Sequence, residues 1–206
     1  THSGKGMAAF KFNDDVLTLN IHTLPAKDMD VLSTINIPLS DIIKQSDICL
    51  MSFKARLTSG GENGVGYIKA WVQNDKSTKA LFARTDVKSE WTDCYLPFVG
   101  IANLSNMGFR YGGMVQGLEI KDFKVINYGP DKNIKSLKST ALRGENTVAP
   151  LFIDHVPVAD ASEIDLNTIP DEGIVIVDNN ELTGNYTTNI KGYADVAVEG
   201  DVLKVN

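Results

Sequence analysis

Hydrophobic and polar residues alternate with a period of two along most of the first 129 residues. This alternation predicts nine strands, over Met7–Phe12, Val16–Thr23, Val31–Pro38, Ile48–Thr58, Val65–Gln73, Lys79–Thr85, Thr92–Val99, Met107–Tyr111 and Leu118–Asn127. Short stretches rich in Asn, Asp and Gly separate these segments. Helical periodicity is confined to Leu39–Gln45, where Ser40 is placed to cap a single turn. Short strands at this spacing predict an all-β sandwich, of which the jelly roll is one form.

The same alternation predicts which side chains face the core, because neighbouring residues of a strand point to opposite faces. The inward set comprises Met51, Phe53, Ala55, Leu57, Ile68, Ala70, Val72, Cys94, Leu96, Phe98, Met107, Phe109 and Tyr111. The outward set comprises Lys54, Arg56, Tyr67, Lys69, Trp71, Gln73, Trp91, Asp93, Tyr95 and Arg110. Four of the outward residues are large aromatics, which is unusual for a surface that faces only water.

The character of the chain changes after Gly129-Pro130, and we expect a boundary there. Residues 1–130 hold 14 basic and 13 acidic residues, whereas residues 131–206 hold 6 basic and 13 acidic ones. We interpret residues 1–129 as the jelly-roll β-sandwich and 130–150 as a linker or crossing segment. Residues 151–206 then form a small acidic β unit, with short strands over Leu151–Val156, Gly173–Val177, Asn185–Ile190, Asp195–Val198 and Val202–Val205. This unit either packs on the sandwich or begins a longer domain.

Composition and motifs argue against several classes of function. Neither half of the chain has the basic stripe that nucleic-acid binding requires. The sequence also contains no run of about 18 apolar residues, so membrane insertion is not predicted. The chain has no nucleophile elbow, and its acidic residues are not brought together in an aromatic cleft, so no catalytic residues are predicted. The two cysteines, Cys49 and Cys94, leave open a disulfide or two buried thiols.

The outward aromatics Tyr67, Trp71, Trp91 and Tyr95 are the main candidates for ligand contact. Flat rings offer a large, rigid surface to the apolar C–H face of a sugar. Donors and acceptors for the hydroxyls are available in Arg56, Lys69, Gln73, Asp93 and Arg110, and an arginine also suits a uronic-acid carboxylate. The alternative is that these rings are covered by a loop, by residues 130–206 or by neighbouring side chains.

Three motifs between Ile48 and Tyr128 resemble the carbohydrate-binding modules of the family 4/9/22 type. They are Ser52–Arg56 followed by a Gly-rich turn, Glu90–Phe98 with its Trp, Cys and Tyr, and Gly117–Val125 with an Asp before the last apolar residues. The resemblance implies a jelly roll that binds a polysaccharide or oligosaccharide along a sheet or at loop tips. It also implies a structural calcium ion, with Asp122 as its ligand, although an ion-paired or turn-forming Asp122 is the alternative. Trp91 corresponds to a residue that is often structural in these modules, which makes Tyr67 and Trp71 the better candidates.

The leading hypothesis is therefore a non-catalytic carbohydrate-binding protein, secreted or on the cell surface. The ligand-binding set comprises Arg56, Tyr67, Trp71, Gln73, Trp91, Tyr95 and Arg110. A second hypothesis is the accessory portion of a secreted glycan-degrading enzyme, whose partner would be a catalytic domain. A third is a structural or adhesive surface protein without a glycan ligand, because one fold supports many functions.

Overall fold

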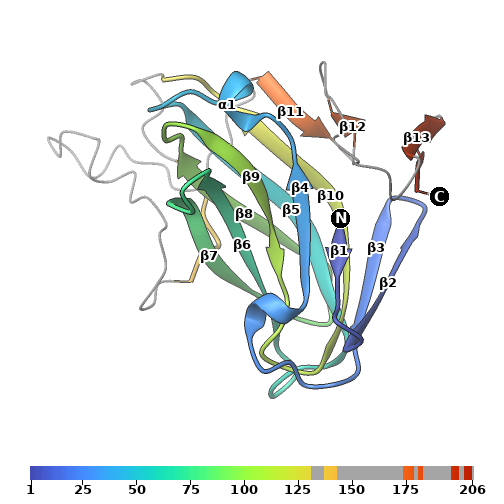
Figure 1. Ribbon diagram of the computed structural model, residues 1–206. Helices are drawn as coiled ribbons and strands as arrows, with labels where there is room; N and C mark the ends of the chain where they lie inside the picture. Colours follow the sequence, from blue (N-terminus) through green and yellow to red (C-terminus); the bar gives the residue numbers. More distant parts are fainter. Residues whose placement is uncertain (131–136, 143–173, 179–180, 183–195, 200–201, 206) are drawn as a thin grey trace, which may run out of the picture.

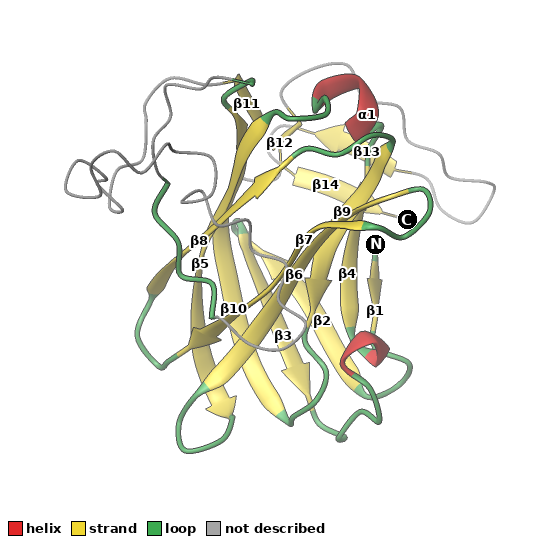
Figure 2. Cartoon of the chain, turned by 90° about the vertical axis from the view of Figure 1, so that its left-hand side faces the viewer, coloured by secondary structure: helices red, strands yellow, loops and turns green. Residues whose placement is uncertain are grey.

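A computed structural model describes residues 1–130, 137–142, 174–178, 181–182, 196–199 and 202–205. The strands are β1 (His2–Ser3), β2 (Ala8–Asn13), β3 (Val16–Ile21), β4 (Leu32–Asn36), β5 (Ile48–Gly60), β6 (Gly66–Asn74), β7 (Lys79–Val87), β8 (Thr92–Val99), β9 (Leu104–Arg110), β10 (Gln116–Asn127), β11 (Ile174–Asp178), β12 (Glu181–Leu182), β13 (Val196–Glu199) and β14 (Val202–Val205). Helix is confined to two single turns in this part of the chain, η1 (Asp28–Asp30) and α1 (Leu39–Ile42) (Figure 2). All nine strands predicted for the first 129 residues are present.

Two antiparallel sheets pack face to face as a jelly-roll β-sandwich (Figure 1). The five-stranded sheet has the order β1-β4-β9-β6-β7. In the seven-stranded sheet, β10 pairs with β5 on one side and with β3 and β11 on the other, and β8 and β2 lie toward its edges. Strands β13 and β14 pair only with each other in the described part of the chain.

The core lies between the two sheets and uses the inward side chains that the alternation predicts. Ile68, Ala70 and Val72 of β6 are fully buried, as are Cys94 and Leu96 of β8. Burial of apolar side chains is the main driving force for this packing. The predicted inward and outward faces of both strands are therefore confirmed.

Three phenylalanine rings connect the two sheets at the centre of the core. Phe109 of β9 packs edge-on against Phe53 of β5 at a centroid distance of 5.0 Å, and against Phe123 of β10 at 5.4 Å. Edge-to-face pairs of this kind add about 0.5–1.5 kcal/mol to the effect of burial. This cluster fixes the two sheets against each other and so holds their outer faces in place.

The cysteines are free thiols, which settles the alternative left open by the sequence. Cys49 lies opposite Phe98, and Cys94 lies opposite Phe53, on the paired strands β5 and β8. The offset of four positions corresponds to about 13 Å along the strands, beyond the 7 Å that a disulfide tolerates.

The single helical turn was predicted in the right place but with the wrong cap. Pro38 occupies the N-cap of α1, and no side chain caps the helix there. The helix starts at Leu39, so Ser40 lies inside the turn, two positions after the N-cap.

Residues 137–142 close one side of the sandwich, where β7 and β8 form the edges of their sheets. The Thr140 N–H donates to the Tyr95 carbonyl of β8 at 2.8 Å, and the Leu142 N–H donates to the Arg84 carbonyl of β7 at 2.8 Å. Figure 1 shows this segment as an orange trace beside β7. It satisfies backbone groups on both exposed edges.

The chain beyond residue 142 contributes at least one strand to the sandwich. Strand β11 pairs with β10 from Lys124 to Asn127. The predicted strands Leu151–Val156 and Asn185–Ile190 lie outside the described residues, so the division into 1–129, 130–150 and 151–206 stays a prediction. No helix in the described residues is long and apolar enough to cross a membrane.

Candidate functional site

The structure divides the seven predicted ligand residues between two opposite faces of the sandwich. Tyr67, Trp71 and Gln73 of β6 and Arg110 of β9 lie on the outer face of the five-stranded sheet. Arg56 of β5, Tyr95 of β8 and the nearby Trp91 belong to the outer face of the seven-stranded sheet. The outward aromatics therefore do not form one surface, because β6 and β8 belong to different sheets.

The aromatic residues of the seven-stranded face already have partners within the protein. The Trp91 ring lies 4.8 Å from the Arg56 guanidinium and 4.4 Å from the Lys121 ammonium. Arg56 in turn pairs with a carboxylate oxygen of Glu119 at 2.6 Å. The centre of the Tyr95 ring lies 4.8 Å from the Lys138 ammonium. These contacts describe a packed surface, as the alternative interpretation of the outward rings expects.

A hollow of about 280 Å³ on the seven-stranded face has few features of a ligand site. It is lined by Ser52, Phe53, Lys54, Asp93, Tyr95, Asp122 and Lys124. Asp122 lies at a β-bulge with a φ of 54° and pairs with Lys54 at 3.4 Å. Among the described residues no group of three or more His, Cys, Asp or Glu side chains could hold a metal ion. Calcium binding by Asp122 stays a prediction.

The outer face of the five-stranded sheet carries a floor of three aromatic rings, Tyr67, Trp71 and Phe82. Trp71 lies opposite Phe82 of β7 on one side and Gly108 of β9 on the other. A β-carbon at Gly108 would lie 2.9 Å from the indole Cζ2, so the indole extends over the glycine. The missing side chain at position 108 therefore provides the space that Trp71 occupies.

Four cations lie over this aromatic floor. The Lys79 ammonium is 5.6 Å from the centre of the Trp71 ring, and the Arg84 guanidinium is 4.2 Å from that of Tyr67. The Phe82 ring has the Arg110 guanidinium at 5.2 Å and the Lys69 ammonium at 5.9 Å. Each contact is within the range of a cation–π interaction. We call Lys69, Lys79, Arg84 and Arg110 the cation layer.

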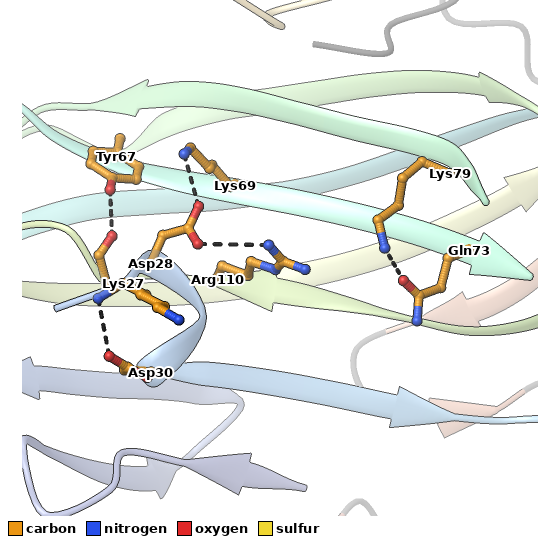
Figure 3. Close-up of polar contacts among 9 residues, drawn as sticks. Lys27, Asp28, Asp30, Tyr67, Lys69, Gln73, Lys79 and Arg110 are labelled. Carbon is orange, nitrogen blue, oxygen red and sulfur yellow. Dashed lines mark hydrogen bonds and ion pairs between the residues drawn. The ribbon is translucent and has the colours of Figure 1, made fainter. Parts of the chain in front are cut away.

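Two carboxylates neutralise part of the cation layer. Asp28 of η1 accepts a hydrogen bond from Lys69 at 2.8 Å and lies 3.6 Å from Arg110 (Figure 3). Asp86 of β7 pairs with Arg84 at 2.9 Å. The ammonium of Lys79 donates to the side-chain oxygen of Gln73 and has no carboxylate partner among the described residues (Figure 3).

Burial and a neighbouring charge both act on Lys79. Partial burial lowers the pKa of its ammonium, and the positive charge of Arg110 lowers that pKa further. Both effects disfavour the charged form of a lysine. Among the described residues, this end of the face therefore carries a lysine that no carboxylate neutralises.

Two buried polar side-chain atoms lack a hydrogen-bond partner in the described residues, and both belong to this face. They are Nε1 of Trp71, a donor, and Oδ1 of Asn106, an acceptor. Asn106 lies opposite Gln73, two positions from the Gly108 that faces Trp71, so the two residues are diagonal neighbours across β6 and β9. An unpaired buried polar group costs about 1–3 kcal/mol, which a bound polar ligand would recover.

Tyr67 is held more firmly than an outward strand residue usually is. Its hydroxyl donates to the Gly112 carbonyl, and its backbone N–H donates to the side-chain oxygen of Gln116 at 3.0 Å. Only 6% of Tyr67 is exposed, and burial together with the charge of Asp28 raises the pKa of its phenol. The hydroxyl is engaged within the protein, so Tyr67 shapes the face rather than offering a free polar group.

Several residues of this face were not among the sequence candidates. Phe82 and Arg84 are outward positions of β7, and the alternation applied to that strand identifies both. Asp28 comes from η1, and its place under Lys69 depends on tertiary contacts that no local pattern reports. Lys79 was missed because its contact with Gln73 and its nearness to Arg110 are likewise visible only in the structure.

Comparison with known proteins finds no matching family model and no matching curated protein. The chain is similar in structure to several carbohydrate-binding modules. These include the CBM1 of BiXyn10A in its apo form, with a TM-score of 0.49, 13% identity and coverage of 62% of this chain and 86% of that one. They also include the CBM22-1 xylan-binding domain of Paenibacillus barcinonensis Xyn10C (TM-score 0.46, 11% identity, 62% and 84% coverage).

A third similar structure is the N-terminal cellulose-binding domain of Cellulomonas fimi β-1,4-glucanase C, with a TM-score of 0.43, 13% identity and 60% and 85% coverage. The expected resemblance to carbohydrate-binding modules is confirmed to this extent. Likeness at this level assigns no family, ligand or binding site to the chain. The function has to be argued from the residues of the site itself.

Proposed function

We propose that the chain binds carbohydrate, without cleaving it, on the outer face of the five-stranded sheet. The unpaired indole N–H of Trp71, next to the unpaired Asn106 oxygen, is the observation that carries this proposal. A sugar ring presents several hydroxyls, each able to donate and to accept, so adjacent hydroxyls can serve both atoms.

The surroundings of these two atoms also suit a sugar. The aromatic floor of Tyr67, Trp71 and Phe82 provides an apolar base, and Gln73 provides an amide whose oxygen already faces Lys79. Binding sites for small ligands combine apolar walls with a few fixed polar groups in this way. The ligand-binding set proposed here keeps Tyr67, Trp71, Gln73 and Arg110 from the sequence candidates and leaves out Arg56, Trp91 and Tyr95.

The proposal extends to the setting of the protein. Carbohydrate binding without catalysis fits a secreted or surface-exposed location, with a polysaccharide as the partner and a catalytic domain elsewhere in the assembly. These elements rest on the proposed binding function and would fall with it.

The test is affinity electrophoresis and titration calorimetry against soluble plant, algal, host and bacterial polysaccharides, with Trp71→Phe and Trp91→Phe variants. Both substitutions remove an indole N–H, but on opposite faces, so Trp91→Phe is a matched control. We expect Trp71→Phe to weaken binding about tenfold, because a lost hydrogen bond of about 1–1.5 kcal/mol corresponds to that factor. Trp91→Phe should bind like the parent protein.

Two results would overturn the proposal. One is the absence of binding to every polysaccharide by a folded protein, which would favour the structural or adhesive role. The other is loss of binding in Trp91→Phe with Trp71→Phe unaffected, which would place the site on the opposite sheet. Thermal unfolding of each variant shows whether the fold is retained.

A further inference from the structure

The charge of the proposed site points to a particular class of carbohydrate. We infer that its ligand is an anionic polysaccharide, one that carries carboxylates or sulfate esters, and that Lys79 and Arg110 contact the anionic groups. This inference rests on the proposed carbohydrate-binding function and specifies its substrate class.

The first support is the local excess of positive charge. In the described part of the chain, the four cations of the cation layer face two carboxylates, Asp28 and Asp86, on the same surface. The chain as a whole has a net charge of −6, and residues 1–130 are close to neutral. The excess on this face is therefore a property of the site and not of the composition.

The second support is that the cation layer lies over the aromatic floor. All three rings of the aromatic floor have an ammonium or guanidinium group within 6 Å of their centres, and Trp71 is only 6% exposed. A neutral sugar that stacked on these rings would have to displace the cations first. An anionic sugar gives the displaced cations an opposite charge to pair with, which offsets the ring contacts that they lose.

The third support concerns the two cations with unused capacity. Lys79 has no carboxylate partner among the described residues, and its single polar contact is the Gln73 amide. Arg110 lies 3.6 Å from an Asp28 carboxylate that Lys69 approaches more closely, at 2.8 Å. A guanidinium carries five N–H donors in a planar fork, so Arg110 can still bind a carboxylate or sulfate through two of them.

The position of Lys79 ties the anion site to the sugar site. Its ammonium lies above the Trp71 ring, whose indole N–H is unpaired. Both Trp71 Nε1 and Asn106 Oδ1 are buried, so a monosaccharide reaches them as the Lys79 ammonium moves from the ring onto a carboxylate or sulfate of the same sugar. A single charged sugar unit can satisfy both requirements.

The opposite face provides an internal comparison. There, Arg56 pairs with Glu119 at 2.6 Å and Lys54 pairs with Asp122 at 3.4 Å. Lys54 and Arg56 thus have carboxylate partners, whereas Lys79 has none in the described part of the chain; Lys121 on the opposite face lies over the Trp91 ring. Lys54 is therefore a suitable control position for removing a lysine charge outside the proposed site.

The experiment measures binding of the parent protein, Lys79→Gln, Lys54→Gln and Trp71→Phe to three groups of polysaccharide. The groups are carboxylated (polygalacturonate and alginate), sulfated (carrageenan and chondroitin sulfate) and neutral (xylan, β-glucan and hydroxyethylcellulose). We expect the parent to bind a carboxylated or sulfated polymer at least tenfold more tightly than any neutral one. The first two groups distinguish carboxylate from sulfate as the preferred anion.

The variants locate the anion contact. Lys79→Gln should weaken binding to the anionic polymer about tenfold, while Lys54→Gln changes it less than twofold. Raising NaCl from 50 to 500 mM should weaken parent binding more than Lys79→Gln binding, because salt screens exposed charges. An Arg110→Lys variant keeps the charge and loses the planar fork. Its affinity for the anionic polymer should lie between the affinities of Lys54→Gln and Lys79→Gln.

The possible failures are distinguishable. Binding to neutral polymers alone, with dependence on Trp71, overturns the anionic class and leaves carbohydrate binding in place. Equal losses in Lys79→Gln and Lys54→Gln indicate general charge attraction, and no loss in either shows that Lys79 does not contact the ligand. Both results overturn the inference. No binding to any of the three groups overturns the proposed function itself.

Discussion

Gln116 acts as a substitute strand partner at the point where the five-stranded sheet runs out. Pairing between β6 and β9 begins at Lys69, so Tyr67 has no β9 residue beside it. The buried Gln116 side chain accepts from the Tyr67 N–H at 3.0 Å and donates to the Tyr67 carbonyl at 3.0 Å. It also donates to the Tyr111 carbonyl at 2.8 Å. An amide side chain thus does here what a neighbouring backbone would otherwise do.

Substituting Gln116→Leu removes these contacts while roughly keeping the volume. The Tyr67 N–H and the carbonyls of Tyr67 and Tyr111 then lose their side-chain partner in a place where Gln116 is 0% exposed. Each of the three buried unpaired groups costs about 1–3 kcal/mol, so we expect a loss of about 3–9 kcal/mol in the free energy of unfolding. That is a large fraction of the roughly 5–15 kcal/mol that stabilises a typical domain.

Urea unfolding followed by tryptophan fluorescence and far-UV circular dichroism measures the effect. With a slope of about 1–3 kcal/mol per molar urea, the midpoint should fall by at least about 1 M. Gln45→Leu is the matched control, because Gln45 is exposed, and its unfolding free energy should change by less than about 0.5 kcal/mol. If both variants unfold at the same urea concentration as the parent, the reasoning about Gln116 is wrong.

Three further predictions follow from buried or crowded groups. Neither cysteine should react with a thiol reagent in the native protein, and both should react in denaturant. Burial raises the pKa of Cys94 to about 11, so its contribution to stability is full below pH 9 and is lost as the pH rises toward 11. In urea unfolding at pH 8 and 10.5, Cys94→Ala should reduce this loss of stability without removing it, because burial also raises the pKa of Cys49. Gly108→Ala should lower the free energy of unfolding by about 1–3 kcal/mol in the same assay, because the added methyl group would collide with the Ser33 carbonyl. A hydrogen bond from Lys5 holds the pKa of Asp30 below its usual 3.8. The ionised carboxylate therefore stabilises the fold above pH 3.8, and this stabilisation is lost as the pH falls through the lowered pKa. Asp30→Asn should lower the melting temperature at pH 7 more than at pH 2.5.

The strands could be predicted from the sequence because burial imposes a period of two on every strand that covers the core. Ile68, Ala70 and Val72 on β6, and Cys94, Leu96 and Phe98 on β8, follow the rule without exception. The helical turn was placed correctly from its spacing, but its cap was not. Pro38 occupies that position without any capping bond, so propensity alone could not have identified it.

The site was predicted only in part, because alternation separates inside from outside without saying which sheet a strand joins. Trp71 and Trp91 have the same outward character in the sequence, yet they lie on opposite faces of the sandwich. The unpaired atoms of Trp71 and Asn106 depend on the absence of partners from other strands, which no single strand reveals. Asp28 was missed for the same reason, since it reaches the face from a turn that lies 41 residues before Lys69.

The segment from Leu137 to Leu142 has a practical consequence for recombinant expression. The turn at Gly129-Pro130 looks like a natural place to end a shortened protein, but a chain cut there would lose the hydrogen bonds that Tyr95 and Arg84 make with this segment. Uncovered edge strands recruit other chains and lead to aggregation. A shortened protein should therefore extend at least to Leu142. A version that ends at residue 129 lacks β11 as well, so the effect of this segment is measured by comparing the aggregation of proteins that end at residues 142 and 129.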